Sequence, residues 1–306
     1  MANEIVYSGI GDLTVASVMS SEALLLLADR NALMNHPALL YAGDSKGSSS
    51  VAMKIPHLGL MGYDILASTG DGSAVANTAL TDGSTTVTPA RYSKSYEQSD
   101  LARFTVQGGI LDPSMFAQDA VVSSGATLVD IIANLVDDFA TVVGTSGVDA
   151  TFQNWLDCKR ALDVQNVQGP LLAIIHPTQW HDILQDLALN TGGAAQFMPA
   201  TQEMINSRGN GFKGQLAGVD VFTTTRVPTA NAAADRAGGM FGRGAIVWGD
   251  TGLDADDPNN QISIGGKILF ERDRTAKSGL TAYVTHRYLG ATEGIDLAGV
   301  SIITDA

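Results

Sequence analysis

Hydrophobic residues recur at helical spacing in one long segment near the middle of the chain. Between Leu128 and Val143 the apolar positions share one face of a helix, and Asp130 and Asn134 lie on the opposite face. This pattern predicts one long helix over residues 113–144, weakened at Ser123-Ser124-Gly125 and ended by Gly144. The side chains expected on its buried face are Leu128, Ile131, Leu135, Phe139 and Val142.

The pattern changes to shorter elements after this helix. A second amphipathic helix is predicted from Asp149, then a buried strand over residues 171–175 and a helix after His176-Pro177. Further strands are predicted at residues 219–224, 245–248, 262–272, 281–289 and 295–303. A long helix, then mixed helices and strands, then a strand-rich end predict an α+β fold rather than a regular βαβ repeat.

The N-terminal third has a different pattern. Residues 1–20 read as an extended arm, and a helix is predicted from Ser20 to Leu33, ending before Pro37. Residues 58–88 carry few charges and are rich in small residues, which predicts a long hairpin that packs on another surface. A mobile insertion is the alternative interpretation. Strict alternation then places Tyr92, Lys94 and Tyr96 on one strand face.

The composition supports a packed but weakly charged protein. Hydrophobic residues make up 45% of the chain and charged residues only 16%, against about 25% in ordinary soluble domains. The richest apolar run, residues 24–27, is far shorter than the ~20 residues of a membrane span. The N-terminus lacks the basic start and apolar stretch of a signal peptide. We therefore expect neither a membrane protein nor a secreted one.

The charge balance argues against tight binding of nucleic acid. The net charge is −14, and the most basic segment, residues 267–277, alternates arginines with acids. Phosphate backbones are bound by clustered lysines and arginines that release counterions, and no such cluster is present in the sequence. The single cysteine, Cys158, excludes an internal disulfide and a multi-cysteine metal site.

Two glycine motifs match catalytic or nucleotide-binding patterns only in letters. Residues 209–214 match G-x-G-x-x-G, but a predicted strand follows the glycines instead of preceding them. Residues 43–47 match G-x-S-x-G around Ser45, but no helix is predicted after the serine, as a nucleophile elbow requires. Flexible turns are the simpler interpretation of both, and a serine hydrolase using Ser45 is the distant alternative.

Histidines and acids give no metal-site pattern either. His176 and His181 are five residues apart, so they do not share a helix face as in H-E-x-x-H, and His286 lies in a predicted strand as a structural residue. The acidic stretch 250–260 departs from the calcium-binding loop pattern because Pro258 interrupts it and the glycine is missing. The sequence therefore predicts no catalytic residue, no metal site and no cofactor.

The order of these features resembles the major capsid proteins of tailed bacteriophages, which have the Hong Kong 97-like fold. The resemblance rests on Ala173-Ile174-Ile175-His176-Pro177, on Gly218-Val219-Asp220-Val221, on Arg226-Val227-Pro228 and on the C-terminal strands. It implies an N-terminal arm (1–50), an extended hairpin or E-loop (51–107) and a spine helix with the first part of the P domain (108–168). An A domain (169–260) and C-terminal strands that return to the P domain (261–306) would follow.

The resemblance also implies a function. The chain would be a structural protein, not an enzyme, that assembles with itself as hexamers and pentamers into the icosahedral head of a virion, in the host cytoplasm. The shell would enclose double-stranded DNA without binding it tightly, with portal, scaffold and decoration proteins as further partners and no membrane. Tyr92, Lys94 and Tyr96 would contact a neighbouring subunit. An encapsulin-like compartment shell is the nearest alternative.

Overall fold

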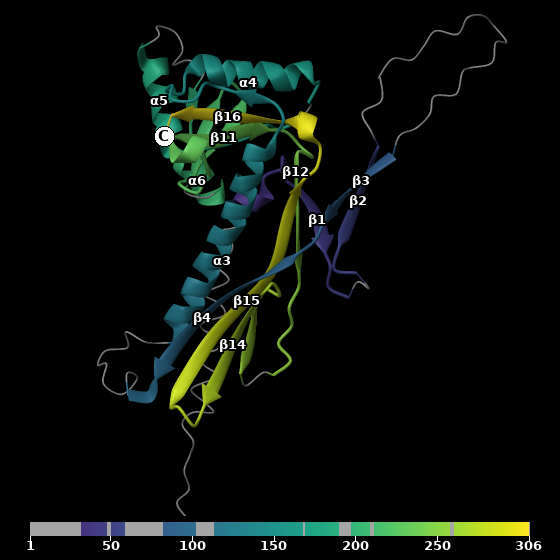
Figure 1. The fold of residues 1–306 in the computed structure, drawn as a ribbon, viewed down its shortest axis with the longest axis vertical. Helices are drawn as coiled ribbons and strands as arrows, with labels where there is room; N and C mark the ends of the chain where they lie inside the picture. The colour runs from purple at the N-terminus through teal and green to yellow at the C-terminus, as the bar shows by residue number, and fades with distance from the viewer. Residues whose placement is uncertain are drawn as a thin grey trace, which may run out of the picture.

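The computed structural model describes residues 32–47, 50–58, 82–101, 113–167, 169–189, 197–208, 211–257 and 260–305. Figure 1 shows an upper part, where helices lie around a sheet, and a long, narrow lower part built on a second sheet. Helix α3 (Pro113–Leu135) runs diagonally from the lower part into the upper one. The helix expected at residues 20–33 and most of the expected arm lie outside the described residues.

The lower sheet is organised around one long strand, β15 (Leu280–Glu293). One edge of β15 pairs with β4 (Ala90–Ser99). The other edge pairs first with β14 (Ile268–Thr275) and then with β12 (Ile246–Thr251), and all three pairings are antiparallel. Outside these strands, β13 (Gln261–Ile264) pairs with β14, and β1 (Leu40–Asp44) pairs with β12. Buried and half-buried residues alternate along β15, so one face of this sheet is covered.

The upper sheet mixes parallel and antiparallel strands. Its members, in spatial order, are β5 (Val142–Val143), β16 (Gly299–Asp305), β11 (Asp235–Phe241), β6 (Leu172–Ile175), β9 (Val219–Thr223), β8 (Phe212–Leu216) and β7 (Phe197–Pro199), with β10 (Thr229–Ala230) beside β11. Helices α4 (Phe152–Val164) and α5 (Pro177–Leu189) supply Trp155, Leu162 and Ile183 to the core on one face. The short helix α6 (Gln202–Arg208) precedes β8.

Helix α3 joins the cores of the two sheets. Near its start, Ala120 and Val121 pack with Phe270 and Tyr283 of the lower sheet. Near its end, Leu128 packs in a second cluster that includes strands of the upper sheet. By length and composition, residues 116–138 could also cross a membrane, but this packing accounts for the apolar residues as a core helix.

The buried face of the spine ends earlier than the sequence predicts. Leu128 and Phe139 are buried, and Ile131 and Leu135 pack half-buried against the same cluster. The α-helix stops at Leu135, a short 3-10 turn, η2 (Val136–Asp138), follows, and Phe139 has an extended backbone. Val142 therefore lies in strand β5 with 52% of its surface exposed, so its placement on the buried face was wrong.

Several other predicted elements are confirmed, and two are corrected. The strand and helix around His176-Pro177 are present as β6 and α5. The strand expected over 262–272 is instead the hairpin β13–β14, because Gly265 and Gly266 turn the chain with positive φ angles. The start of the last predicted strand is a 3-10 turn, η5 (Asp296–Ala298), before β16.

Gly144 gives a test of the contact between β5 and β16. It has a φ of +106°, and an added Cβ would lie 2.2 Å from the carbonyl oxygen of Ile303. We expect Gly144→Ala to lower the free energy of unfolding by about 3 kcal/mol or more, since backbone strain and overlap add. Gly147 is the matched control, because its φ is +71° and an added Cβ would have no atom within 4 Å. Gly147→Ala is expected to lower the free energy of unfolding by about 1 kcal/mol. Equal losses in urea unfolding would contradict this account.

Candidate functional site

A two-stranded hairpin leaves the lower sheet and projects away from the rest of the protein. Strands β2 (Met53–Leu58) and β3 (Asp82–Val87) pair only with each other, and Leu58 lies opposite Asp82 at the outer end. Val87, at the inner end, is 1% exposed, whereas residues 53–56 and 83–86 are exposed or half-buried. Residues 59–81 lie outside the described residues. The hairpin is therefore anchored at its base, and farther out its two strands have only each other as strand partners among the described residues (Figure 1).

The next strand, β4, belongs to the body and not to this hairpin. It pairs with β15 along its whole length, from Ala90 opposite Leu289 to Ser99 opposite Leu280. The expected extended loop over 51–107 therefore contains a strand of the lower sheet. The alternation of the sequence shows which residues share a face of β4, but it does not show what covers that face.

Tyr92, Lys94 and Tyr96 face helix α3 of their own chain. Lys94 Nζ donates a hydrogen bond to Asp119 Oδ2 at 2.6 Å, and Tyr96 Oη donates to the same oxygen at 2.5 Å. The Tyr96 ring also lies 5.3 Å from the ring of Phe116. The polar groups of Lys94 and Tyr96 thus meet α3 of their own chain. Their contact with a neighbouring subunit stays a prediction. Tyr92 remains 38% exposed.

These contacts favour the charged forms of both partners. The hydrogen bond with Asp119 raises the pKa of Lys94 above its usual value. Desolvation, the largest single effect on Asp119, raises the pKa of its carboxyl group, but the hydrogen bonds from Lys94 and Tyr96 outweigh it and the pKa is lowered. The ion pair therefore fixes β4 against the spine at neutral pH.

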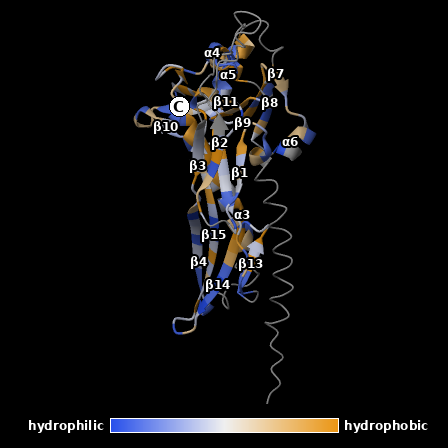
Figure 2. Cartoon of the chain, turned by 90° about the vertical axis from the view of Figure 1, so that its right-hand side faces the viewer, coloured by the Kyte–Doolittle hydropathy of each residue, from blue (hydrophilic) through white to orange (hydrophobic). Residues whose placement is uncertain are grey.

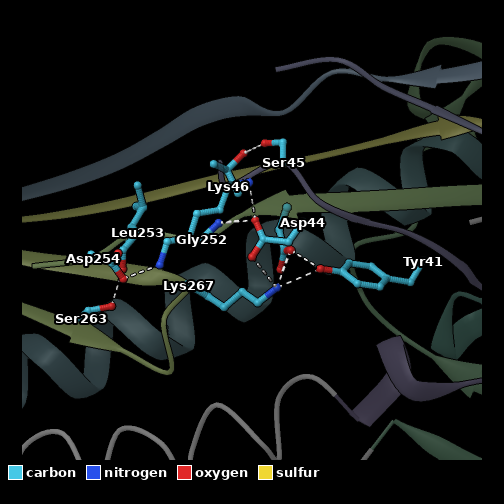
Figure 3. A network of polar contacts seen from close by, with 11 residues as sticks. Tyr41, Asp44, Ser45, Lys46, Gly252, Leu253, Asp254, Ser263 and Lys267 are labelled. Atoms are coloured by element: carbon cyan, nitrogen blue, oxygen red, sulfur yellow. Dashed lines mark hydrogen bonds and ion pairs between the residues drawn. The ribbon is translucent and has the colours of Figure 1, made fainter. Parts of the chain in front are cut away.

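A second polar network lies where β1 runs beside β12 (Figure 3). Asp250, 2% exposed, accepts hydrogen bonds from Tyr41 Oη and Lys267 Nζ, each at 2.5 Å. Lys267 Nζ also lies 2.9 Å from Tyr41 Oη and 3.9 Å from Asp44 Oδ2. The Tyr41 ring packs on Trp248, with 4.6 Å between ring centroids. Strands β1 and β12 and the turn between β13 and β14 are thus joined through one buried carboxylate.

The pKa shifts of Tyr41 and Lys267 result from burial and from the hydrogen bonds within this network. Burial, followed by the hydrogen bond to Asp250, raises the pKa of Tyr41. For Lys267, desolvation is the largest effect and lowers the pKa, but the hydrogen bonds with Asp250 and Tyr41 outweigh it and the pKa is raised. Lys267 therefore stays protonated and supplies the charge that buried Asp250 needs.

Ser45, the candidate nucleophile, lies beside this network. Its Oγ is 2.5 Å from Thr251 Oγ1, and the chain after it turns without forming a helix (Figure 3). Within the described ranges, no histidine hydrogen-bonds to Ser45, so no base is placed to activate the hydroxyl. The structure thus gives Ser45 a structural contact with β12.

The other sequence motifs are not brought together as sites. His176 Nδ1 lies 2.7 Å from Thr178 Oγ1 at the start of α5, and His286 Nδ1 lies 2.8 Å from Ser93 Oγ. In the acidic stretch, Gln261 Oε1 accepts hydrogen bonds from the backbone of residues 256 and 257. Two glycine-motif residues, 209 and 210, lie outside the described residues. Within the part of the chain that the structure describes, no group of three metal-ligating side chains is present.

Cys158 is a core residue in helix α4. Burial raises the pKa of its thiol to about 12, so the nucleophilic thiolate is suppressed at neutral pH. This placement gives Cys158 no role as a nucleophile.

A buried carboxylate that the sequence analysis missed joins the N-terminal segment to the upper sheet. Asp220, 6% exposed, accepts hydrogen bonds from His36 Nε2 at 2.8 Å, Arg208 Nη1 at 2.5 Å and Gln215 Nε2 at 2.7 Å. Desolvation is the largest effect on the Asp220 carboxyl and raises its pKa, but these hydrogen bonds and the charge of Arg208 outweigh it and the pKa is lowered. His36 and Asp220 are too far apart in sequence for any local pattern to indicate the pair.

Acidic residues meet where the spine ends and the last strands begin. Glu293, Asp296 and Asp138 come from β15, η5 and η2. Burial, then the hydrogen bond and charge of Asp296 and the charge of Asp138, raises the pKa of Glu293 to about 7. Glu293 is therefore the described carboxyl group whose charge changes near neutral pH.

Comparison with known proteins finds similar folds among solved structures of phage capsids and of an encapsulin. No family model and no curated protein matches the sequence. The structure is similar to the capsid of cyanophage P-SCSP1u, with a TM-score of 0.62, 10% identity and 86% of each chain covered. It is also similar to the capsid of cyanophage Pam1, with a TM-score of 0.60, 13% identity and coverage of 91% of this chain and 92% of that chain.

A bacterial compartment protein has a similar structure. The holo-SrpI encapsulin complex from Synechococcus elongatus PCC 7942 matches with a TM-score of 0.56, 11% identity and coverage of 87% of this chain and 85% of that chain. These similarities confirm the capsid fold expected from the sequence, at the level of the whole chain. They do not test the predicted boundaries of the arm, E-loop, P domain and A domain.

Lys267 gives a test of the network in Figure 3. Lys267→Met leaves Asp250 buried without its cation, and we expect the free energy of unfolding of the unassembled subunit to fall by about 2–3 kcal/mol. Lys46→Met is the control, because Lys46 pairs with Asp254 where the two side chains are 47% and 65% exposed, and its loss should stay below about 1 kcal/mol. Urea unfolding followed by tryptophan fluorescence measures both. Similar losses for the two variants would show that the buried network adds nothing.

Glu293 gives a test of the acidic junction. Its pKa in the folded protein, about 7, lies above the usual 4.5, so its stabilising contribution is complete below pH 4.5 and is lost as pH rises through about 7. Glu293→Gln cannot ionise, so we expect the variant to gain stability relative to the wild type as pH rises across that window. Unfolding free energies of both proteins at about pH 5 and about pH 8.5 measure the difference. A difference that does not change with pH would contradict the assignment.

Proposed function

We propose that this chain is the major capsid protein of a tailed bacteriophage, which forms the head shell of a virion around double-stranded DNA. The observation that supports this most strongly is the similarity to phage capsid structures over most of both chains. The β2–β3 hairpin gives the similarity a physical meaning, because its strands pair with no other strand among the described residues.

In the proposed assembly, each subunit contributes a rigid body and an outstretched hairpin. The body consists of the two sheets joined by α3, and the hairpin would lie over a neighbouring subunit. Residues 169–260 would form the A domain around the centre of each hexamer or pentamer, and residues 261–306 would complete the P domain. We keep Tyr92 as a proposed contact between subunits, since 38% of its surface is exposed.

The charge of the chain suits a container for DNA. A net charge of −14 disfavours adsorption of a polyanion, so the packaged DNA would stay mobile within the shell. The free end of β14 carries Arg272 and Arg274, but each lies next to Asp273, and Arg274 pairs with Asp100 at 2.9 Å. Figure 2 shows this end of the lower sheet as hydrophilic. Portal, scaffold and decoration proteins would be the other partners.

An encapsulin-like compartment shell is the second candidate, because an encapsulin has the same fold. The two functions differ in contents: a phage head holds DNA, whereas a compartment holds protein cargo. Portal and terminase genes beside this gene would support the phage function, and a gene for a cargo enzyme would support the compartment.

The hairpin gives the test of the proposed assembly. Leu58 and Asp82 are paired, so residues 59–81 can be replaced by a two-residue Asn-Gly turn without changing the described strands. We expect this variant to keep the melting temperature and circular dichroism of the wild-type subunit but to form no closed shells in negative-stain microscopy. The wild type, expressed in the same way with its scaffold, is expected to form shells.

A second outcome separates loss of folding from loss of assembly. If the shortened variant melts like the wild type and still forms shells of normal size, the role given to the hairpin is wrong. If the wild type stays monomeric even beside its scaffold and portal, the proposed shell function is itself overturned.

A further inference from the structure

A cavity of about 210 Å³ lies between helix α3 and the face of strands β4 and β15. It separates the two apolar clusters that α3 joins, one around Tyr283 and the other around Leu128. The helix presents Ser123 and Ser124 to it, and these small side chains leave the space unfilled. The Ser123-Ser124 pair, which the sequence analysis singled out in the spine helix, therefore lies at a polar cavity in the core.

Arg287 of β15 projects into this cavity from the buried face of its strand. It is 3% exposed, and its Nη1 donates a hydrogen bond to Ser124 Oγ at 2.7 Å. Its Nε is buried with no hydrogen-bond partner among the described residues. No described carboxylate lies within ion-pair distance of the guanidinium group, so a full positive charge is buried without a counterion.

The nearby acids are already engaged elsewhere. Asp250 acts on Arg287 through its charge, but its hydrogen bonds go to Tyr41 and Lys267. Asp119 accepts from Lys94 and Tyr96. Taking a charge out of water without a partner costs several kcal/mol. Lys94 is thus already paired with Asp119, whereas no described acid contacts the buried guanidinium group of Arg287, which is the lining charge that calls for an anion.

The other groups around the cavity are suited to the same ligand. Lys94 lies on the lining, with a side chain that is 43% exposed, and connects the cavity to solvent. Because Ser124 Oγ accepts from Arg287, its hydroxyl hydrogen is free to donate to another group. Thr285 adds a second hydroxyl group from the strand. Guanidinium, ammonium and hydroxyl donors together are the donor set that binds carboxylate and phosphate oxygens.

We propose that this cavity binds a small oxyanion, held by Arg287 with Lys94, Ser124 and Thr285 as further donors. The volume corresponds to roughly seven water molecules at ~30 Å³ each, which accommodates a phosphate or a carboxylate with some water. The oxyanion comes either from solution, as phosphate, or from an aspartate or glutamate side chain of a second copy of this chain. In both cases it cross-links the spine to the sheet through the gap in the core.

Inorganic phosphate is the probe for the unassembled subunit. At constant ionic strength, we expect phosphate, but not chloride, to raise the melting temperature in a saturable way, by about 2–5 °C once phosphate is well above its Kd. Isothermal titration of phosphate should show one site per chain. No difference between phosphate and chloride in the wild type would overturn the proposal.

Two variants connect the effect to the cavity. Arg287→Met keeps an unbranched side chain but removes the guanidinium group and its charge, and it should abolish the response to phosphate. Arg274→Met, which removes an exposed arginine paired with Asp100, is the matched control and should respond like the wild type. Thr285→Val keeps the shape of the side chain and should weaken phosphate binding about tenfold, which decides the question if Arg287→Met fails to fold. An unchanged Kd in Thr285→Val, or an unchanged response in Arg287→Met, would contradict the site.

Assembled shells distinguish the two sources of the oxyanion. If shells still bind phosphate, the ligand comes from solution. If subunits bind phosphate and shells do not, the cavity is filled in the shell by a carboxylate of a sister chain. The subunit measurements stand without shells, so failure of the oxyanion site leaves the proposed assembly untouched, and failure of assembly leaves the site testable.

Discussion

The packing of helix α3 against strand β15 is the interaction on which the rest of the structure depends. The alternation along β15 buries one face over nearly its whole length, and α3 covers that face before it enters the core of the upper sheet. Both cores therefore share one helix, and the two sheets are held as one body (Figure 1). Everything that leaves this body, above all the β2–β3 hairpin, lacks a comparable surface within the described chain.

Sequence patterns predicted those helices and strands that bury one continuous face, because their apolar residues then recur at regular spacing. The amphipathic pattern around Leu128 gave the spine, and the apolar run before His176-Pro177 gave β6 and α5, because each buries a continuous face. The end of the spine was missed because Phe139 and Val142 continue the apolar spacing after the backbone has become extended. Strand β11 was not predicted at all, since its glycines give it little side-chain pattern.

The polar contacts could not be predicted, because they join residues that are distant in sequence. Alternation placed Tyr92, Lys94 and Tyr96 on one face, but only the fold shows that α3 covers this face and that Asp119 receives two of the three side chains. Nothing local indicates that Asp250 and Asp220 are buried, or which cations and donors reach them. The small residues of the spine were visible in the sequence, but their meaning depends on Arg287, which faces them from another element.

The molecule combines a body, made of two sheets joined by α3, with the β2–β3 hairpin that extends from it. In the proposed shell, the buried polar networks stabilise the body, and the hairpin packs on a neighbouring subunit. The measurement that tests this most directly is an electron cryomicroscopy map of the assembled particle. The account predicts a closed shell in which the β2–β3 hairpin of each chain lies on a neighbouring chain. A map in which the hairpin folds back onto its own chain, in a protein that does not form shells, would contradict it.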